Sequence, residues 1–352
     1  MCGLEGKTAM RNRRILIAIG VALMLTQPWQ ALADCSFHVQ KTPVPSLVGK
    51  LVFASCTTTD CTDSHLYLYD FASPGLQQID KKSWNISGSS NPVLMLDGKA
   101  VLFSAVDPSA SQRDLYYWQI GTKRLYTLTL PSDIDEDVKL SSDGKRITWK
   151  ITDRERTQTQ IDTADLTRAN GVPTLQNQSL IIGGAVGDDE VSGPTFSPTQ
   201  KFIYYYKGTG SAETVWRIEV ATKVQQQMAN AYAFYPVDPD LYEFLYAGWP
   251  GHTSPDKIFV ASLQTGTATP WNVNDCTADN SDPAPVDEDY FFYSRRDPVT
   301  ENPRYELYLG QISTGYAWSL DALKINPKTG NALGANYTSA GRVAPRPSRT
   351  LR

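Results

Sequence analysis

The sequence of 352 residues has few of the side chains on which the commonest catalytic and metal sites depend. It contains three histidines, five cysteines and five methionines. It has no Gly-x-Ser-x-Gly elbow, no His-Glu-x-x-His motif and no glycine-rich phosphate loop. Thirty-three Lys and Arg against 37 Asp and Glu give a net charge of -4, without the basic excess typical of nucleic-acid binders. We therefore expect no nucleic-acid partner and no hydrolase or nucleotide site of these kinds.

Long apolar runs are also missing, except for one near the N-terminus. The run 15–25 follows Arg11, Arg13 and Arg14 and precedes Ala31-Leu32-Ala33. It is well short of the roughly 20 residues that a membrane-spanning helix needs. The order of basic, apolar and small residues is typical of a secretory signal peptide. We expect residues 1–33 to be a signal peptide cleaved after Ala33, no transmembrane segment, and a periplasmic or secreted protein.

Four cysteines remain after this cleavage: Cys35, Cys56, Cys61 and Cys276. An even number in an exported chain favours two disulfides. Cys56 and Cys61 bracket a short loop between two strand-like segments, so we favour the pairs Cys56–Cys61 and Cys35–Cys276. The two other pairings remain open. A Cys/His metal site is the alternative, but the close two-residue spacing of zinc ligands is missing.

A strand-turn-strand pattern recurs along the chain at roughly the size of a propeller blade, about 40–50 residues. Its landmarks are Gly49-Lys50, Gly98-Lys99, Gly144-Lys145 and the equivalent Gln200-Lys201. A glycine at this point supplies the positive φ of a tight hairpin, and the apolar run after it suits a buried strand. We expect an all-β, six-bladed β-propeller with four-stranded antiparallel blades over residues 34–322. A seven-bladed ring is the nearest alternative, because the interval between the third and fourth landmarks is long.

The hairpin segments resemble the repeats of a known family. The segments 96–103 and 196–204, Leu-Asp-Gly-Lys-Ala-Val-Leu-Phe and Phe-Ser-Pro-Thr-Gln-Lys-Phe-Ile-Tyr, are similar to the WD40-like (PD40) repeat of TolB-type propellers. TolB proteins are periplasmic and present their propeller to partner proteins. They also carry an α/β domain before the propeller, whereas residue 34 leads here almost directly into the first repeat. The resemblance therefore implies the fold, but not a role in the Tol system.

The composition changes after the last repeat. Residues 323–352 contain several Pro, Gly and basic residues and few apolar ones, which is typical of chain that does not order itself. We expect a flexible C-terminal tail over this range. The alternative is that residues 336–343 return to complete the sheet of the first or last blade and close the ring.

Acidic residues gather before the first strands of several repeats. In a propeller these strands line the central channel, so carboxylates before them converge on one mouth and could bind Ca²⁺ through oxygen ligands. The alternative is that they are ordinary solvated turn residues. We expect no other cofactor. The candidate metal ligands are Asp133, Asp135, Asp137, Asp188, Asp189 and Asp282.

Loop aromatic residues and one imidazole give a second candidate surface. Trp118, Trp149 and Trp216 lie inside strand-like segments, and we expect them in the core between blades. Trp84, Trp249 and Trp271 fall outside the regular strands, and His252 lies in a turn-rich loop. They could contact a glycan or a peptide, or could be ordinary loop residues. We expect a non-catalytic binding or scaffold protein that recognises a protein or a glycan of the envelope or extracellular space on one end of the ring. The alternative is a polysaccharide lyase or glycoside hydrolase that uses Asp135, Asp137, Asp188 and Asp189.

Overall fold

The computed structural model describes most of the chain beyond the N-terminal segment. Described are residues 38–41, 43–57, 63–109, 112–130, 132–209, 213–229, 235–236, 243–248, 256–262, 268–270, 277–287, 289–299, 303–326 and 330–339. They belong to one compact unit, Ala31–Arg352. The expected signal peptide, residues 1–33, lies outside the described residues, so its cleavage stays a prediction.

The described strands form six sheets, five with four strands and one with five. The first sheet contains β25 (Asn331–Thr338), β2 (Lys50–Cys56), β3 (His65–Asp70) and β4 (Leu76–Gln78). The second contains β5 (Ser87–Leu94), β6 (Ala100–Asp107), β7 (Gln112–Gln119) and β8 (Leu125–Thr127). The third contains β9 (Ile134–Leu140), β10 (Arg146–Thr152), β11 (Gln158–Ala169) and β12 (Val172–Ala185).

The remaining three sheets follow the same order. The fourth contains β13 (Val191–Phe196), β14 (Phe202–Lys207), β15 (Thr214–Glu219) and β16 (Gln225–Ala229). The fifth contains β17 (Tyr235–Pro236), β18 (Glu243–Gly248), β19 (Lys257–Ser262) and β20 (Ala268–Pro270). The sixth contains β21 (Asp279–Pro285), β22 (Tyr290–Arg296), β23 (Tyr305–Gln311), β24 (Tyr316–Ser319) and β1 (His38–Val39).

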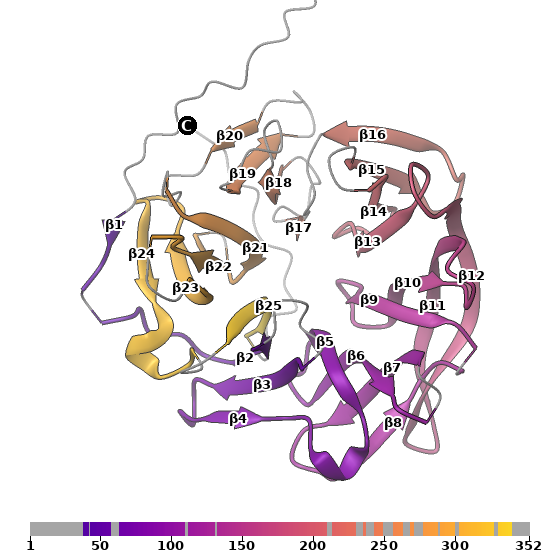
Figure 1. The fold of residues 1–352 in the computed structure, drawn as a ribbon, viewed down its shortest axis with the longest axis horizontal. Helices are drawn as coiled ribbons and strands as arrows, with labels where there is room; N and C mark the ends of the chain where they lie inside the picture. Colours follow the sequence, from indigo (N-terminus) through magenta and orange to yellow (C-terminus); the bar gives the residue numbers. More distant parts are fainter. Residues whose placement is uncertain are drawn as a thin grey trace, which may run out of the picture. The chain divides into compact units, whose positions relative to one another are not determined.

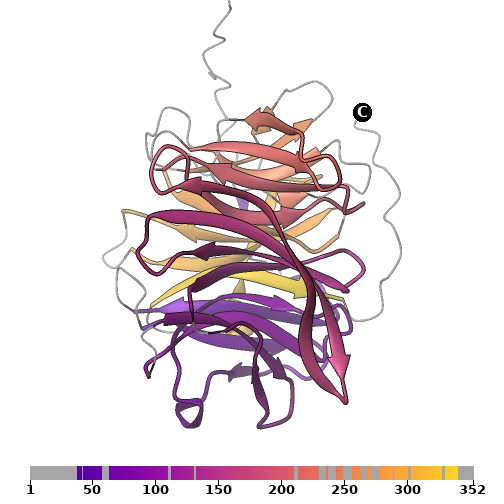
Figure 2. The same ribbon diagram turned by 90° about the vertical axis from the view of Figure 1, so that its right-hand side faces the viewer.

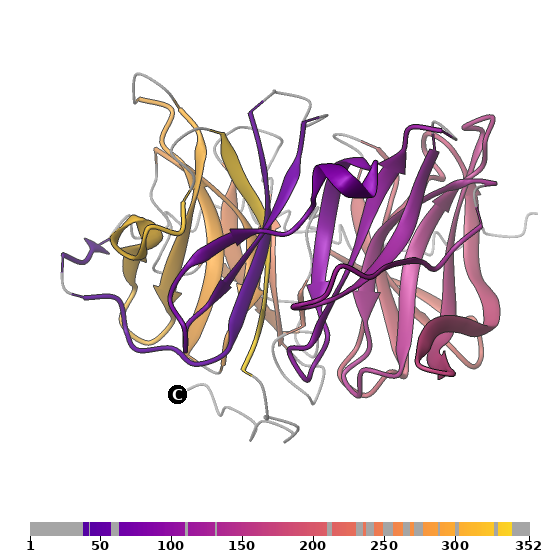
Figure 3. The same cartoon turned by 90° about the horizontal axis from the view of Figure 1, so that it is seen from below.

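The sheets follow one another around a common centre, with β5, β9, β13, β21 and β25 innermost (Figure 1). Neighbouring strands within each sheet are antiparallel, except that β1 pairs in parallel with β24. Figure 3 shows the sheets from below, standing side by side with their strands steeply inclined. The chain is therefore an all-β propeller with four-stranded antiparallel blades, as the repeats predicted.

The hairpins at three of the four landmarks form where they were predicted. The landmark Gly49-Lys50 forms none, because the strand paired with the inner side of β2 is β25, from the C-terminal part of the chain. Gly98 (φ 63°) and Gly144 (φ 72°) donate their N–H groups to Met95 and Ser141, and Gln200 (φ 59°) bonds to Ser197 in the same way. A left-handed residue is needed here because the chain reverses over very few residues. Gln200 thus takes the backbone conformation of the glycines, so the predicted equivalence is confirmed.

Apolar side chains pack between neighbouring sheets. One cluster joins Val52 and Leu68 of the first sheet to Phe103 and Trp118 of the second. A second cluster joins the second sheet to the third around the fully buried Trp149. The expected assignment to the inter-blade core is confirmed for Trp118 and Trp149, whereas Trp216 is half-buried and packs at the edge of a third cluster. Because each sheet buries both faces against its neighbours, the strands after the hairpins are apolar on both sides.

The C-terminal part of the chain contradicts the expected flexible tail. Residues 331–338 form β25, which pairs with β2 in the register Lys50↔Thr338. Its side chains also contact the neighbouring sheet, because Asn336 Oδ1 accepts a 2.9 Å hydrogen bond from Leu94 N. A boundary at residue 323 is therefore wrong for this segment. The alternative, a strand that returns to complete the first sheet, is the one that the structure shows, because β25 pairs with β2.

The outer hairpin of the third sheet is much longer than its counterparts. β11 and β12 extend beyond the neighbouring strands at one end of the ring (Figure 2). Near its tip, Arg168 bonds to the Tyr117 hydroxyl, and its guanidinium lies 5.2 Å from the centroid of that ring. Leu166 and Leu175 pack against the core shared by the second and third sheets. The hairpin formed by β11 and β12 therefore contacts the second sheet as well as its own.

Two short 3-10 helices complete the described elements, Lys82–Trp84 and Leu320–Leu323. No helix in the described part of the chain is long and apolar enough to cross a membrane.

Cys56 is buried at the end of β2 and is not a free thiol. Cys35, Cys61 and Cys276 lie outside the described residues, so both disulfide pairings stay predictions.

Candidate functional site

The same backbone irregularity occurs in each innermost strand whose register is described in full. The strand pairing shifts register in β5, β9, β13, β21 and β25, and each shift contains a residue with positive φ. These residues are Asn91, Asp137, Gly193, Asp282 and Gly334, with φ between 50° and 60°. A bulge of this kind re-aims side chains. Its repetition around the centre sets which polar groups face the central channel.

The first cavity, here called the channel cavity, lies among these bulges and has a volume of about 350 Å³. Its charged lining residues are Arg113, Lys139 and Asp282, which come from the second, third and sixth sheets. The other lining residues are Ala54, Cys56, Ser64, Gly88, Ser90, Asn91, Leu333 and Gly334. The cavity is thus polar and is shared by four sheets.

Lys139 lines the channel cavity and interacts with the carboxylates of Asp137 and Asp282. Burial lowers the pKa of Lys139, while Asp137 and Asp282 act to raise it. Burial also raises the pKa of Asp282, against the hydrogen bond from the Gly334 backbone and the charge of Lys139. Desolvation penalises both ions, so each depends on the opposite charge nearby. Asn91 donates a hydrogen bond to Asp137 and fixes that carboxylate.

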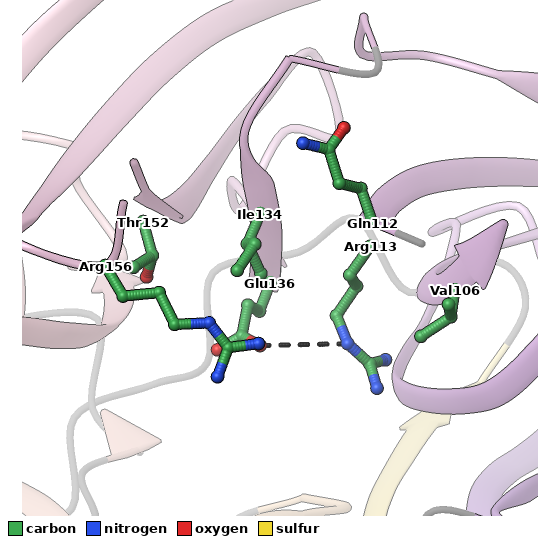
Figure 4. A pocket seen from close by; sticks show the side chains of 7 residues that line it. All are labelled: Val106, Gln112, Arg113, Ile134, Glu136, Thr152 and Arg156. Carbon is green, nitrogen blue, oxygen red and sulfur yellow. Dashed lines mark ion pairs between the residues drawn. The ribbon is translucent and has the colours of Figure 1, made fainter. Parts of the chain in front are cut away.

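A second cavity, here called the inter-sheet cavity, opens between the second and third sheets and has a volume of about 340 Å³ (Figure 4). Figure 4 shows Arg113 and Arg156 on opposite sides of Glu136. Arg113 Nε lies 3.7 Å from Glu136 Oε1. The full lining is Val106, Gln112, Arg113, Ile134, Glu136, Thr152 and Arg156. Arg113 also lines the channel cavity, and its Nη1 donates to Gly88 O at 2.7 Å, so its side chain separates the two spaces.

Glu136 belongs to a series of ion pairs that runs from Arg113 of the second sheet to Glu190, just before the fourth sheet. Its Oε2 lies 3.8 Å from Lys150 Nζ, which lies 3.0 Å from Glu190 Oε1. Burial and the nearby Asp137 raise the pKa of Glu136, whereas Lys150, Arg113 and Arg156 lower it. The carboxylate is held by cations from two sheets, which makes it part of the wall of the inter-sheet cavity.

Asp135, expected at the channel mouth, instead points into the protein. Its side chain is 4% exposed and accepts a 2.7 Å hydrogen bond from Trp149 Nε1. Burial raises its pKa to about 7, against hydrogen bonds from Thr129 and Trp149. The nearby Asp114 is also buried, and its Oδ1 has no hydrogen-bond partner within the described part of the chain. These acids belong to the packing between the second and third sheets.

The other acidic candidates do not converge with it. Asp133 is half-buried and lies next to Ser132, whereas Asp188 and Asp189 are exposed. Asp189 pairs with Lys207 Nζ at 2.8 Å. Among the six candidate metal ligands, only Asp282 lines one of the two cavities. In the residues that the structure describes, no group of three or more His, Cys, Asp or Glu side chains is placed to hold a metal ion.

The aromatic candidates are only partly described. Trp84 ends the first 3-10 helix, is half-buried, and its ring lies 5.9 Å from that of Trp118. This contact gives Trp84 a packing role in the second sheet. Trp249, His252 and Trp271 lie outside the described residues, so their contact with a ligand stays a prediction.

The sequence did not predict the basic residues that line the two cavities, Arg113, Lys139 and Arg156. One signal could have located the channel lining. The dipeptides Asn91-Pro92, Gly193-Pro194 and Asp282-Pro283 recur at the bulge of three innermost strands. A Gly, Asn or Asp before a recurring proline marks a break in the strand pairing.

Comparisons with known proteins support the fold. No protein-family model and no curated protein matches the chain. TolB from Acinetobacter baumannii superposes with a TM-score of 0.60 at 12% identity, covering 82% of this chain and 66% of that one. Hydrazine synthase from Kuenenia stuttgartiensis gives 0.61 at 11% identity, covering 86% and 48%. A structure of the nidogen/laminin complex gives 0.57 at 10%, covering 83% and 99%.

At such low sequence identity, the structural similarity establishes the fold and nothing about function. The protein is a β-propeller, and within that class its fold is TolB-like. The chain spans about two thirds of the TolB chain and about half of the hydrazine synthase chain. A propeller is a scaffold that carries unrelated functions, so function has to be argued from the site.

Proposed function

We propose that this protein is an exported, six-bladed binding propeller that recognises a partner protein at the inter-sheet cavity. The observation that carries the proposal is the cavity of about 340 Å³ next to Arg113, lined by charged, amide and aliphatic groups. A concave site with a few placed polar groups is the usual form of a ligand site. The six sheets would be the six blades, with β1 added to the sixth.

The arrangement of the carboxylates supports binding rather than glycoside hydrolysis. A glycosidase needs two carboxyl groups facing one substrate cleft, about 5–9 Å apart. Asp135 is buried against Trp149, while Asp188 and Asp189 are exposed elsewhere. None of these three, nor Asp137, lines either cavity. The proposed role therefore rests on the shape and charge of the cavity.

The proposal also includes export. The expected cleavage after Ala33 would release the chain into the periplasm or the medium, where disulfides form. The mass of the protein recovered from that compartment tests this. A chain that retains residues from Met10 onward would contradict the cleavage.

A photo-crosslinking residue placed at Thr152, in the inter-sheet cavity, tests the binding role in cells. We expect a discrete adduct with one envelope or extracellular protein. The same residue at Gln77, on the exposed outer strand β4, is the matched control. Equal adducts from both positions, or none from Thr152, would refute the proposed function.

A further inference from the structure

The wall of the inter-sheet cavity carries more positive than negative charge. Two guanidinium groups, those of Arg113 and Arg156, line it with a single carboxylate, Glu136. Among the charges next to this wall, Lys150 and Glu190 pair at 3.0 Å, and Asp137 interacts with Arg113 and Glu136. A concave wall of this kind favours a ligand that brings a negative charge.

Arg156 lies near enough to Glu136 to act on its charge, but it is not locked in place by the protein. Its side chain is exposed, and its guanidinium has no hydrogen bond or ion pair within the described residues. Its backbone is left-handed (φ 56°), a conformation that costs a residue with a side chain conformational energy. Asp153 holds this turn in place by accepting hydrogen bonds from Thr157 N and Gln158 N at 2.6 and 2.8 Å. Strain maintained by such a fixed turn is typical of functional positions.

The remaining wall determines which kind of ligand fits. Val106 and Ile134 provide apolar contact. Gln112 is buried, and its Nε2 donates to Ser132 O at 3.1 Å, which holds this side of the wall in place. None of the seven lining residues is aromatic, so the cavity offers no ring on which a sugar could stack. Cations beside aliphatic side chains instead suit the end of a polypeptide, which carries a carboxylate next to its last side chain.

We propose that the inter-sheet cavity binds the C-terminal residue of a partner polypeptide. The terminal carboxylate pairs with Arg156 and with the positive charge of Arg113, the two cations that Figure 4 shows on either side of Glu136. The aliphatic side chain of the terminal residue packs on Ile134 and Val106. This inference rests on the proposed function and specifies the part of the partner that is recognised.

Fluorescence anisotropy with the full mature protein tests the carboxylate directly. The probes are two mixtures of labelled pentapeptides ending in Leu, Ile or Val, one with a free C-terminus and one with a C-terminal amide. We expect the amide mixture to bind about tenfold more weakly, because it lacks the charge that a charge-assisted hydrogen bond needs. Equal binding of both mixtures, or binding of neither, would overturn the inference. So would binding of an oligogalacturonate in place of the peptides.

Variants locate the site. Arg156→Gln should weaken binding of the free-carboxylate mixture about tenfold, while Arg154→Gln, an exposed arginine of the same turn that does not line the cavity, should leave it unchanged. Glu136→Gln should tighten binding, because it removes the competing carboxylate. Equal loss in both arginine variants would contradict the proposed contact. If the Thr152 crosslink forms in cells while Arg156→Gln affects neither it nor the peptides, the inference fails and the proposed function stands.

Discussion

The indole Nε1 of Trp149 donates a 2.7 Å hydrogen bond to Oδ1 of Asp135, and both side chains are buried between the second and third sheets. Burial raises the pKa of Asp135 to about 7. The unfolded chain loses this proton near pH 4, whereas the folded protein keeps it up to about pH 7. Because the folded state binds the extra proton, stability decreases as the pH rises through this range and levels off above it.

The first prediction concerns Asp135→Asn, which keeps an oxygen for Trp149 but cannot ionise. We expect the pH dependence of the free energy of unfolding between pH 4.5 and 7 to flatten, by up to about 1.4 kcal/mol per pH unit. Urea unfolding at a series of pH values measures this. Asp188→Asn, an exposed acid, is the control and should follow the wild-type profile. An unchanged slope in Asp135→Asn would show that this carboxyl does not carry the pH dependence.

The second prediction concerns the channel lysine. Lys139→Met removes the cation that acts on Asp282, and we expect a loss of about 2–4 kcal/mol in the free energy of unfolding at pH 7. The loss should shrink as the pH falls, because burial raises the pKa of Asp282 and a protonated Asp282 no longer needs the cation. Chemical unfolding measures both effects. Lys145→Met, an exposed lysine of the β9–β10 hairpin, should have little effect. Equal losses in the two variants would disprove the role of the channel charges.

The third prediction concerns closure of the ring. A chain that ends after Gly330 lacks β25, which exposes the inner edge of β2, so we expect it to be insoluble or largely unfolded. A chain that ends after Ser339 keeps the strand and should melt at the wild-type temperature. Asn336→Ala in the full chain should cost about 1–2 kcal/mol, since Leu94 N loses its acceptor. Cooperative melting of the shorter chain at the wild-type temperature would contradict this role of β25.

The fourth prediction concerns the cysteines of the mature protein. We expect the disulfides Cys56–Cys61 and Cys35–Cys276. The second closes a loop of more than 200 residues and should contribute up to about 4–5 kcal/mol by constraining the unfolded chain. Peptide mapping without reduction identifies the pairs, and alkylation of the unfolded, unreduced protein should find no thiol. Four alkylated cysteines would exclude both bridges.

The sequence predicted the repeating part of this fold because the information there is local. Each hairpin is specified within a few residues, by Gly98, by Gly144 or by Gln200 in the same conformation, and by the apolar strand that follows. The prediction that the acidic candidates line the channel was only partly correct. Asp282 does line the channel, whereas Asp135 does not. Strand alternation alone would turn Asp135 and Asp137 to the same side, but the bulge at Asp137 breaks that alternation.

By itself, the sequence determined the blade period, the order of strands within a blade and the burial of Trp118 and Trp149. Only the tertiary structure decided that residues 331–338 close the first sheet and that Arg113, Glu136 and Arg156 enclose one cavity. The physical reason is distance along the chain. Leu94 and Asn336 are bonded although more than 200 residues separate them, and the cavity forms only where two sheets meet. Such contacts depend on how whole sheets pack, which no local pattern encodes.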